Sequence, residues 1–373
     1  MNQPLNIITA LDKVKAMGDS NTASMPLVRI HGVNDVRLDT VPVPACGVDD
    51  VLVEVKNCGI CGSDLGYIAM GGFNNPELPM PLGHEMSAVV TIVGEHVTSV
   101  AVGDRVVVNP MKVEPPIGNF GIEGGFAPTL LVRDVANQPE ALLKIPDHLT
   151  HPHAALVEPL SVGMHAVHRG EVTANDKVAI FGAGTIGLSI ALVLRYYGVT
   201  DTVIIDTSAA RIKQAKQLGF HGCLAGEDDV AKVLQQYHGS VSSYGQSIAA
   251  TDVYLEATGV ASVFEQMISL AKMQARLVVV GVHKASASID LVSVLSKELS
   301  IKGAMAYPEE FPEVLSMLET LGDEVAALIT HHFPLSQFDQ ALAMARDTDH
   351  AIKVMIDCQQ SVSYTHLTLP TKA

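Results

Sequence analysis

The sequence has no tryptophan and few cysteines, and the number and spacing of the cysteines exclude some classes of protein. Its five cysteines stand at positions 46, 58, 61, 223 and 358, which are too few and too scattered for a disulfide framework. The small number of cysteines favours a protein that works in a reducing compartment. No apolar run reaches the roughly 20 residues of a membrane-spanning helix, and charges interrupt the apolar stretch over 5–16, so no secretory leader is indicated. We therefore expect a cytoplasmic protein that does not bind a membrane.

Positive charge is also scarce, because 24 lysines and arginines stand against 40 acidic residues and give a formal net charge of −16. Such a surface repels phosphate backbones and anionic lipids, so nucleic acid and membranes are not expected as partners. Small neutral substrates, or a cofactor held by local dipoles, fit better. With 373 residues, of which 48% are hydrophobic and 17% charged, the chain is long enough for two well-packed domains.

The first half of the chain is dominated by short β patterns. From residue 27 to about 131, apolar runs are broken by glycine, proline and aspartate, for example at 50–55, 87–93 and 105–109. Helical periodicity is weak throughout this half. The pattern predicts a β-rich, barrel-like unit.

The second half alternates apolar strands with amphipathic helices from about residue 160. We expect strands at 177–181, 202–205, 252–257, 275–281 and 300–304, and helices at 185–197 and 210–218. This alternation is typical of a doubly wound parallel sheet. The remaining stretch, 311–357, is expected to form a helix pair and a strand that return to the β-rich unit.

Gly182, Gly184 and Gly187 form a Gly-x-Gly-x-x-Gly motif that follows a predicted buried strand and opens a helix. The first glycine permits a tight turn, the second lets a pyrophosphate approach the backbone, and the third allows close packing of the helix on the strand. Together with Ile186, these residues are predicted to bind a dinucleotide at the helix N-terminus. A tight turn without a ligand is the alternative interpretation.

Asp206 lies 19 residues after Gly187, at the end of the next predicted strand. A carboxylate at this position would accept hydrogen bonds from both ribose hydroxyls and would repel a 2′-phosphate, so NAD is favoured over NADP. Arg211 is a nearby cation that could favour NADP, but we expect it to pack along the adenine.

Cys58 and Cys61 form a Cys-x-x-Cys pair that has three interpretations. A redox pair needs a thioredoxin-type helix after it, and residues 62–64 are a poor helix start. A structural zinc knuckle needs a second such pair, which the sequence lacks. In the third interpretation, Cys61 is one thiolate ligand of a catalytic zinc whose other ligands are distant in sequence.

His84 and Glu158 are the candidate partners of Cys61. His84 lies between two β runs, and Glu158 stands in otherwise apolar sequence at the seam between the two halves. A cysteine, a histidine and a carboxylate that leave one position open are typical of a catalytic zinc. Taken alone, a residue such as His84 is more often a hydrogen-bonded core histidine, and one such as Glu158 is more often an N-terminal helix charge favoured by the dipole.

These motifs follow one another in a characteristic order. They are Gly-Ile-Cys-Gly-Ser-Asp at 59–64, Gly-His-Glu at 83–85, Gly-Asp-Arg-Val at 103–106, Glu-Pro-Leu at 158–160 and then the glycine motif. In this order they resemble the zinc-containing medium-chain dehydrogenase/reductase family over roughly residues 27–358. Glu-Pro-Leu, where classical alcohol dehydrogenases place a cysteine, is similar to the sorbitol, idonate, butanediol and threonine dehydrogenase branch.

The resemblance implies an α/β fold with two domains and a cleft between them that holds zinc and NAD. A GroES-like catalytic domain is expected over 25–160 and 303–358, and a Rossmann domain over 161–302. The metal ligands implied are Cys61, His84 and either Glu158 or Glu85, because the two glutamates can exchange places in this branch. The implied enzyme is an NAD-dependent zinc alcohol dehydrogenase that acts on CH–OH groups.

The resemblance also implies roles for further residues. The alcohol oxygen would bind zinc and lose its proton through Ser63, and a hydride would pass to the nicotinamide. Asp64 is expected to orient a metal ligand, and Val280, Gly281 and Val282 to lie near the nicotinamide carboxamide. For Ser63 the alternative is a turn hydroxyl that caps its own backbone.

Several positions depart from the family pattern. The stretch 109–126 contains no cysteine, so we expect one catalytic zinc and no structural zinc. The expected assembly is a homodimer or homotetramer. Gly66 replaces the histidine that ends the proton relay of alcohol dehydrogenases. Ala306 replaces the arginine that precedes Tyr307 in polyol dehydrogenases. Tyr67 and Tyr307 are candidate substrate contacts, and Tyr67 is equally explained by packing. The expected substrate is a small secondary alcohol, vicinal diol or ketone rather than sorbitol.

Two other functions compete with this one. Zinc-free quinone or enoyl reductases share the fold, but Cys61, His84 and Asp206 argue against them. A non-catalytic dinucleotide-binding protein would not need these groups. Outside the fold, we expect an extension over 1–24 and a tail over 359–373 that is foreign to it.

Overall fold

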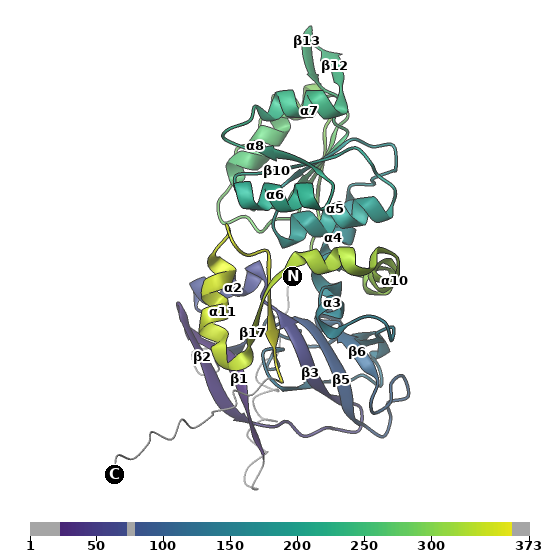
Figure 1. Ribbon diagram of the computed structural model, residues 1–373, viewed down its shortest axis with the longest axis vertical. Coiled ribbons are helices and arrows are strands. Elements are labelled where there is room, and N and C mark those ends of the chain that lie inside the picture. Colours follow the sequence, from purple (N-terminus) through teal and green to yellow (C-terminus); the bar gives the residue numbers. More distant parts are fainter. Residues whose placement is uncertain (1–22, 73–78, 360–373) are drawn as a thin grey trace, which may run out of the picture.

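The computed structural model describes residues 23–72 and 79–359, which form a β-rich unit and a unit built on a parallel sheet (Figure 1). The expected extension over 1–24 and the expected tail over 359–373 lie outside the described residues, except for positions 23, 24 and 359. Among the helices that are described, none has the length and apolar character needed to cross a bilayer.

The β-rich unit consists of a seven-stranded and a three-stranded sheet. The larger sheet has the order β17-β18-β3-β5-β6-β8, with β7 paired to the first half of β3, and the smaller has the order β2-β1-β4. The strands are β1 (Ser24–Gly32), β2 (Asp35–Pro42), β3 (Val51–Gly59), β4 (Met80–Pro81), β5 (Glu85–Val93), β6 (Arg105–Val108), β7 (Thr129–Val132), β8 (Leu142–Lys144), β17 (Ile329–Pro334) and β18 (Lys353–Asp357). The three strands expected at 50–55, 87–93 and 105–109 correspond to β3, β5 and β6.

The strand β3 lies at the centre of this unit. Val51, Val53 and Val55 are completely buried in its core, as expected for β-branched side chains that pack well on a pleated surface. Because β3 pairs with β18, β5 and β7, the cysteine loop that follows it starts from a fixed point.

The helix α2 (Gly62–Met70) begins directly after Cys61, so the expectation that residues 62–64 would be a poor helix start is wrong. Asp64 explains the difference. Its carboxylate accepts a hydrogen bond of 2.9 Å from the backbone N–H of Cys61, which satisfies a donor at the helix N-terminus. The redox interpretation of the cysteine pair is disfavoured on another ground, because Cys58 is completely buried and burial raises the pKa of its thiol.

The second unit contains a six-stranded sheet of order β11-β10-β9-β14-β15-β16, in which every pairing is parallel. Its elements are β9 (Val178–Phe181), α5 (Thr185–Tyr196), β10 (Thr202–Asp206), α6 (Ala209–Gln217), β11 (His221–Leu224), α7 (Val230–His238), β14 (Val253–Glu256), α8 (Ala261–Leu270), β15 (Arg276–Val279), α9 (Leu291–Ser296) and β16 (Ser300–Gly303). The chain reverses its direction of winding between β9 and β14. This order is that of the Rossmann fold, which confirms the expected fold class.

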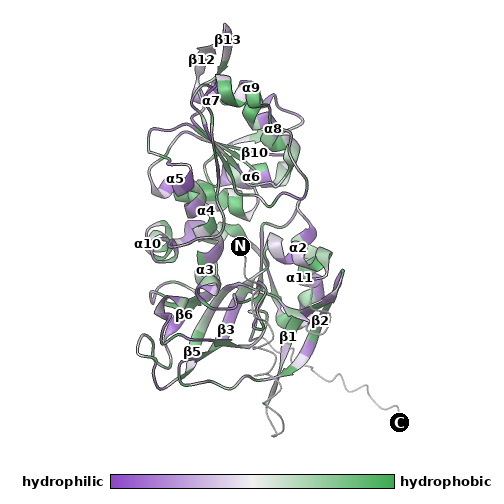
Figure 2. Cartoon of the chain, turned by 180° about the vertical axis from the view of Figure 1, so that it is seen from behind, coloured by the Kyte–Doolittle hydropathy of each residue, from purple (hydrophilic) through white to green (hydrophobic). Residues whose placement is uncertain are grey.

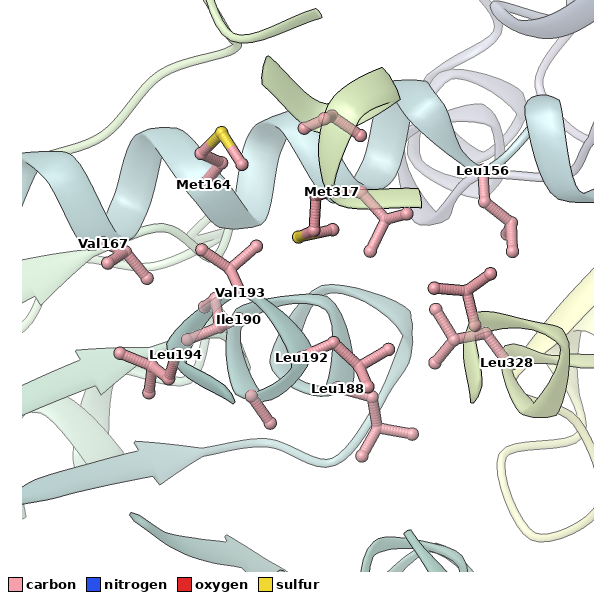
Figure 3. Close-up of a cluster of buried hydrophobic side chains, with 14 of the residues drawn as sticks. Leu156, Met164, Val167, Leu188, Ile190, Leu192, Val193, Leu194, Met317 and Leu328 are labelled. Carbon is pink, nitrogen blue, oxygen red and sulfur yellow. The ribbon is translucent and has the colours of Figure 1, made fainter. Parts of the chain in front are cut away.

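The helix α4 (Val157–Arg169) joins the two units. It packs on α5 and on α10 (Phe311–Leu321), and side chains such as Met164, Ile190 and Met317 from the three helices meet in one apolar cluster (Figure 3). The stretch 311–357 therefore does not return as one body. Its second helix, α11 (Phe338–Arg346), packs on β17 and β18, whereas α10 covers α4 and α5.

Two surface features of the second unit were not expected from the sequence. A hairpin of β12 (Ser240–Ser243) and β13 (Gln246–Ala249) projects beyond α7 (Figure 1). Beside the edge strand β16, the apolar side chains of Leu291, Val292, Leu295 and Met305 are 73–83% exposed, and α9 is largely hydrophobic in Figure 2. The expected homodimer or homotetramer remains a prediction.

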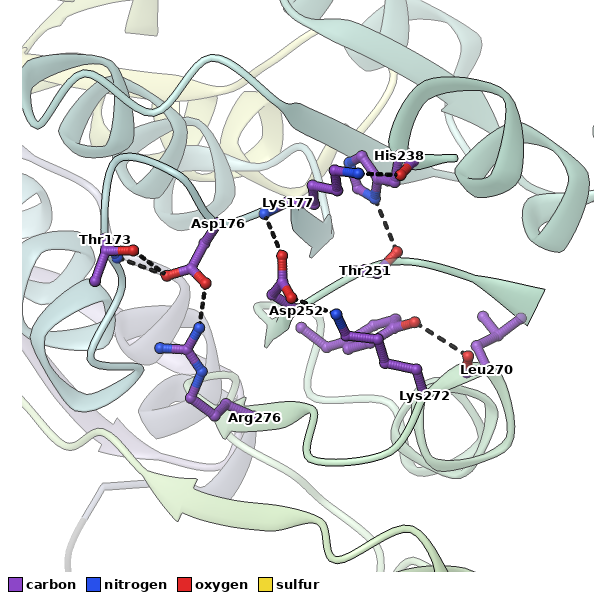
Figure 4. A network of polar contacts seen from close by, with 10 residues as sticks. Thr173, Asp176, Lys177, His238, Thr251, Asp252, Leu270, Lys272 and Arg276 are labelled. Carbon is purple, nitrogen blue, oxygen red and sulfur yellow. Dashed lines mark hydrogen bonds and ion pairs between the residues drawn. The ribbon is translucent and has the colours of Figure 1, made fainter. Parts of the chain in front are cut away.

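A polar network closes the amino edge of the parallel sheet (Figure 4). Asp252, just before β14, accepts hydrogen bonds from the backbone N–H of Lys177 at 2.9 Å and from Lys272. Asp176, before β9, pairs with Arg276 at the start of β15. Charged groups therefore bridge the amino ends of three adjacent strands. In doubly wound sheets, ligands bind at the opposite, carboxyl edge.

We predict that His238, at the end of α7, makes the free energy of unfolding depend on pH. The side chain is buried, its Nδ1 lies 2.8 Å from the hydroxyl of Thr251, and burial lowers the pKa of the imidazole to about 4. Below about pH 6.5 the unfolded chain binds a proton that the folded chain does not. His238 should therefore reduce the free energy of unfolding by about 2 kcal/mol between pH 7 and pH 5.

Urea unfolding of His238→Gln at the two pH values tests this prediction. The variant should lose about 2 kcal/mol of the pH dependence, whereas His221→Gln, at an exposed position in the same unit, should keep it. An unchanged difference between pH 7 and pH 5 in His238→Gln would contradict the assignment.

Candidate active site

Asp64 links the cysteine loop to the predicted histidine ligand. Its side chain is completely buried on α2, and one carboxylate oxygen holds the N–H of Cys61. The other oxygen lies 3.5 Å from Nδ1 of His84. The expected orienting role of Asp64 fits this geometry, because a carboxylate on Nδ1 fixes the ring and leaves Nε2 for a metal.

His84 is placed by the tight connection between β4 and β5. Gly83, before it, has φ of 95° and a Cβ there would lie 2.7 Å from the backbone N of Phe126, so only glycine fits. The Nε2 of His84 lies 3.3 Å from the hydroxyl oxygen of Ser63. Burial opposes a charge on the ring, but Asp64 and Cys61 outweigh it and raise the pKa of His84.

Glu85 forms a buried ion pair with Lys353, the first residue of β18. Both carboxylate oxygens lie 2.6 Å from Nζ, and the ammonium also donates to the carbonyl of Ile60 at 2.9 Å. The two side chains are 2% exposed or less. Lys353 was not identified from the sequence. A lone cation at the start of the apolar strand Lys-Val-Met-Ile is the signal that could have revealed it.

Cys61, His84 and Glu85 form a potential metal site, which we call the Cys-His-Glu group. One ligand atom from each residue can be chosen so that all three lie within 4.8 Å of one another. A sulfur, a nitrogen and a carboxylate oxygen at this separation match the ligands that zinc prefers in catalytic sites. The three residues therefore fit the metal that the sequence indicated, with a charge on Glu85 that is already balanced by Lys353.

Glu158 lies beside this group, on the first turn of α4. It is 7% exposed, and burial raises the pKa of its carboxyl group to about 7, while the charge of His84 opposes the rise and that of Glu85 adds to it. The hydroxyl of Tyr307 hydrogen-bonds the Glu158 carboxylate, and burial together with that carboxylate raises the pKa of Tyr307. Glu85 is thus a member of the Cys-His-Glu group, whereas Glu158 lies outside it but within reach of the charges of His84 and Glu85. Each glutamate has its own partner.

Tyr67 and Phe120 form an aromatic contact on one side of the site. Their ring centroids are 5.9 Å apart. Tyr67 lies on α2, where the charges of His84, Cys61 and Glu158 all reach its hydroxyl and burial raises its pKa. Phe120 comes from the cysteine-free stretch 109–126 and has φ of 81°, an unusual conformation for an aromatic residue. Phe120 was not identified from the sequence.

The glycine motif forms the expected strand-to-helix turn between β9 and α5. Gly182 has φ of 104°, and a Cβ on Gly187 would lie 1.8 Å from the carbonyl oxygen of Gly182. Asp206 ends β10 at the same edge, where its carboxylate accepts from the N–H of Ala183 at 2.6 Å and of Ser208 at 2.8 Å. The turn and the carboxylate are therefore held together, as a dinucleotide site requires.

Arg211, on α6, also lies at this turn. A Cβ on Gly184 would be 3.5 Å from its guanidinium, which donates to the carbonyl of Ala351 at 3.4 Å. The hydroxyl of Thr185 donates to the neighbouring carbonyl of Ile352 at 2.8 Å. The glycine turn is thus tied to the residues that directly precede β18.

Val280, Gly281 and Val282 follow β15 at the same carboxyl edge as the glycine turn. The N–H groups of Val280 and Gly281 both donate to the carbonyl of Glu256 at 2.9 Å. Val282 is 77% exposed. The three residues lie at the edge where the sequence analysis expected them, and their contact with a carboxamide remains a prediction.

Two family models match the chain. One, described as "Alcohol dehydrogenase GroES-like domain", matches residues 47–147, and the other, described as "Zinc-binding dehydrogenase", matches residues 185–320. The chain is similar to sorbitol dehydrogenase of Rattus norvegicus, with 35% identity over 348 residues that cover 88% of this chain and 94% of the relative.

Solved structures agree with these matches. 2R,3R-butanediol dehydrogenase from Bacillus subtilis has a TM-score of 0.79 and 30% identity, over 90% of this chain and 99% of that chain. A Sinorhizobium meliloti 1021 dehydrogenase bound to NADP has a TM-score of 0.79 and 26% identity, over 90% and 100%. The similarity therefore extends over both units described above.

We predict that Lys353→Met destabilises the protein by about 3–5 kcal/mol, because it leaves the buried carboxylate of Glu85 without its counter-ion. Urea unfolding measures the effect. Lys353→Arg should lose much less, and Glu85→Gln combined with Lys353→Met should recover most of the loss. If Lys353→Met and the double variant were equally unstable, the loss would come from packing and not from the unpaired charge.

Proposed function

Since the chain belongs to the zinc-containing medium-chain dehydrogenase family, in its sorbitol-, butanediol- and idonate-dehydrogenase-like branch, we propose that it oxidises a small secondary alcohol with NAD and a single zinc ion. That it is an alcohol dehydrogenase follows from the relatives. The Cys-His-Glu group carries the proposal, because the fold brings the sulfur of Cys61 to the imidazole of His84 and the carboxylate of Glu85, more than 20 residues further along the chain.

The residues proposed to hold the metal are Cys61, His84 and either Glu85 or Glu158. Zinc would supply Lewis acidity at the alcohol oxygen, and the nicotinamide would supply the hydride acceptor. Asp64 would keep the imidazole of His84 in the tautomer whose Nε2 is free to coordinate. Because the stretch 109–126 has no cysteine, we propose one catalytic zinc per chain and no structural zinc.

Ser63 is proposed to take up the proton of the alcohol. Its hydroxyl lies 3.3 Å from Nε2 of His84, so it borders the position where a ligand of the metal would stand. A hydroxyl can accept one proton while it donates another, which suits a relay. Gly66 cannot continue the relay as a histidine would, so we propose that the proton leaves through water.

NAD is proposed as the coenzyme because of Asp206. The S. meliloti neighbour is bound to NADP, so the fold alone does not select the coenzyme. A carboxylate at the end of β10, held against the glycine turn at 2.6 Å, would repel a 2′-phosphate and accept from the ribose hydroxyls. Arg211 is proposed to lie along the adenine.

The substrate is proposed to be a vicinal diol or another lightly hydroxylated secondary alcohol, with its ketone in the reverse direction. Ala306 lacks the donors that would hold the hydroxyl groups of a long polyol. Tyr67 and Phe120 add an aromatic surface near the Cys-His-Glu group, and Tyr307 would position the substrate through Glu158. Zinc-free reduction and non-catalytic dinucleotide binding are the alternatives. Neither requires the Cys-His-Glu group.

We predict about one zinc per purified chain and NAD-dependent oxidation of vicinal diols in preference to sorbitol. Elemental analysis and a screen of diols, polyols, 3-hydroxy amino acids and aromatic carbinols measure both properties. Cys61→Ala should lose the zinc and at least about a hundredfold of the activity. Cys223→Ala changes a buried cysteine of the unit built on the parallel sheet. This variant should keep both the zinc and the activity.

The zinc count and the activity of Cys61→Ala can each contradict the proposal. Two zinc ions per chain would contradict the absence of a structural site. A chain without zinc that reduces quinones or enoyl compounds would instead support a zinc-free reductase. Full activity in Cys61→Ala would show that the zinc mechanism is wrong.

We predict that Asp206→Asn lowers the ratio of kcat/KM for NAD to kcat/KM for NADP by at least about tenfold, because it removes the charge that repels a 2′-phosphate while keeping the size of the side chain. Steady-state kinetics with both coenzymes measures the ratio. The carboxylate of Asp228 accepts a hydrogen bond from the backbone N–H of Leu224. Asp228→Asn should leave the ratio for the two coenzymes unchanged. A wild-type preference for NADP would refute the assignment.

A further inference from the structure

We propose that His283 and Glu256 form a positioning pair that shapes the binding surface for the nicotinamide half of the coenzyme. The inference rests on the proposed use of NAD and adds two residues that the sequence analysis did not identify. Glu256 is the last residue of β14, and His283 follows the Val280–Val282 segment after β15. Both lie at the carboxyl edge of the sheet, next to the reversal of winding between β9 and β14.

Glu256 is a completely buried carboxylate whose oxygens are all engaged. One oxygen accepts from the N–H groups of Thr258 and Gly259, at 2.6 and 2.9 Å, and from the hydroxyl of Thr258. The other accepts from Nε2 of His283 at 2.9 Å. Because a buried charge is costly unless hydrogen bonds satisfy it, this side chain fixes the turn that follows β14.

The backbone of Glu256 fixes the second turn in the same way. Its carbonyl accepts from the N–H groups of Val280 and Gly281, both at 2.9 Å. Glu256 therefore holds two neighbouring turns at the carboxyl edge. Its carboxylate binds the turn after β14, and its backbone carbonyl binds the turn after β15. His283 connects them a second time, from the far end of the 280–282 segment.

Two glycines show how closely these turns approach each other. A Cβ on Gly281 would lie 2.2 Å from the N of Gly259, and a Cβ on Gly259 would lie 2.5 Å from the carbonyl oxygen of Val282. Gly259 also has φ of 70°. The turns meet backbone to backbone, so a shift of one must move the other.

The same turn borders the dinucleotide motif on its opposite side. A Cβ on Gly182 would lie 3.1 Å from the carbonyl oxygen of Ala257 and from the methyl group of Thr258. Residues 256–259 are thus packed between the glycine turn, which is expected to hold the pyrophosphate, and the 280–282 segment. In a Rossmann sheet, the nicotinamide half passes over this point.

The His283 side chain is 19% exposed, whereas Glu256 is not exposed at all. From this partly exposed position, His283 completes the hydrogen bonds of the buried Glu256 carboxylate. Without that donor, one oxygen of Glu256 would lose its partner among the described residues, and the 280–282 segment would lose its second attachment. Residues that bind the adenine half, such as Asp206, are separated from this change by β9.

A comparison of two ligands tests the pair. NADH and ADP-ribose share the adenosine, the pyrophosphate and the second ribose, and only NADH carries a nicotinamide. We expect His283→Leu to raise the dissociation constant of NADH by about tenfold and that of ADP-ribose by less than about twofold. Calorimetric titration of the zinc-loaded protein measures both constants, and the KM for NAD should rise together with the constant for NADH.

Two variants separate positioning from general damage to the unit. His283→Gln keeps a side-chain donor for Glu256 and should restore NADH binding to within about threefold of the wild type. His238→Gln alters a buried histidine at the opposite edge of the same unit, and should leave the ratio of the two dissociation constants unchanged.

The inference would be overturned if His283→Leu weakened both ligands equally, or if NADH binding were unaffected. If wild-type protein bound neither NADH nor ADP-ribose, the proposed use of NAD would be wrong and the inference would fall with it. These outcomes are distinct, because the first concerns the ratio of the constants in a variant and the second the affinity of the unaltered protein.

Discussion

The buried contact between Glu85 and Lys353 is the interaction on which the geometry of the site depends. The two residues are 268 positions apart in sequence, and the ammonium also binds the carbonyl of Ile60, next to Cys61. The N–H of Ile60 donates in turn to Val354 at 2.9 Å. The last strand of the fold therefore holds both the cysteine loop and the carboxylate that follows His84. A buried ion pair adds little net stability, but it strongly disfavours any arrangement in which its partners are apart.

The carboxyl edge of the parallel sheet depends on a different constraint, which is the close approach of backbones rather than charge. Gly187 lies against Gly182, and Gly281 against Gly259, at separations that leave no room for a side chain. At the opposite edge of the same sheet, Asp252 and its partners bridge the strand ends with charged side chains. The amino edge is thus bridged by charged side chains, and at the carboxyl edge glycines let neighbouring turns pack backbone to backbone. In a doubly wound sheet ligands bind at the carboxyl edge, which is where Asp206 lies.

Much of the fold could be predicted because its signals are local. The strands and helices of the parallel sheet follow from alternating apolar segments, and the glycine motif lies on the expected turn between β9 and α5. The start of α2 was predicted wrongly, because a single carboxylate, that of Asp64, compensates for poor helix-forming residues. Lys353 and Phe120 were not identified at all. Their roles come from contacts with Glu85 and Tyr67, across sequence separations that no local pattern encodes.

The choice between Glu85 and Glu158 illustrates how far local signals reach in the site itself. Both carboxylates stand in the right motifs, so the sequence left the ligand open. The structure shows that they differ in their partners: Glu85 faces an ammonium, whereas Glu158 faces the hydroxyl of Tyr307 and has its pKa raised to about 7 by burial. The carboxyl groups of Asp64, Glu85 and Glu158 act on two basic side chains here, those of His84 and Lys353. A divalent cation at the proposed site would add positive charge beside Glu158 and would lower the cost of ionising its carboxyl group. Glu85 therefore has its charge balanced without a metal, whereas the ionised form of Glu158 would be stabilised by one.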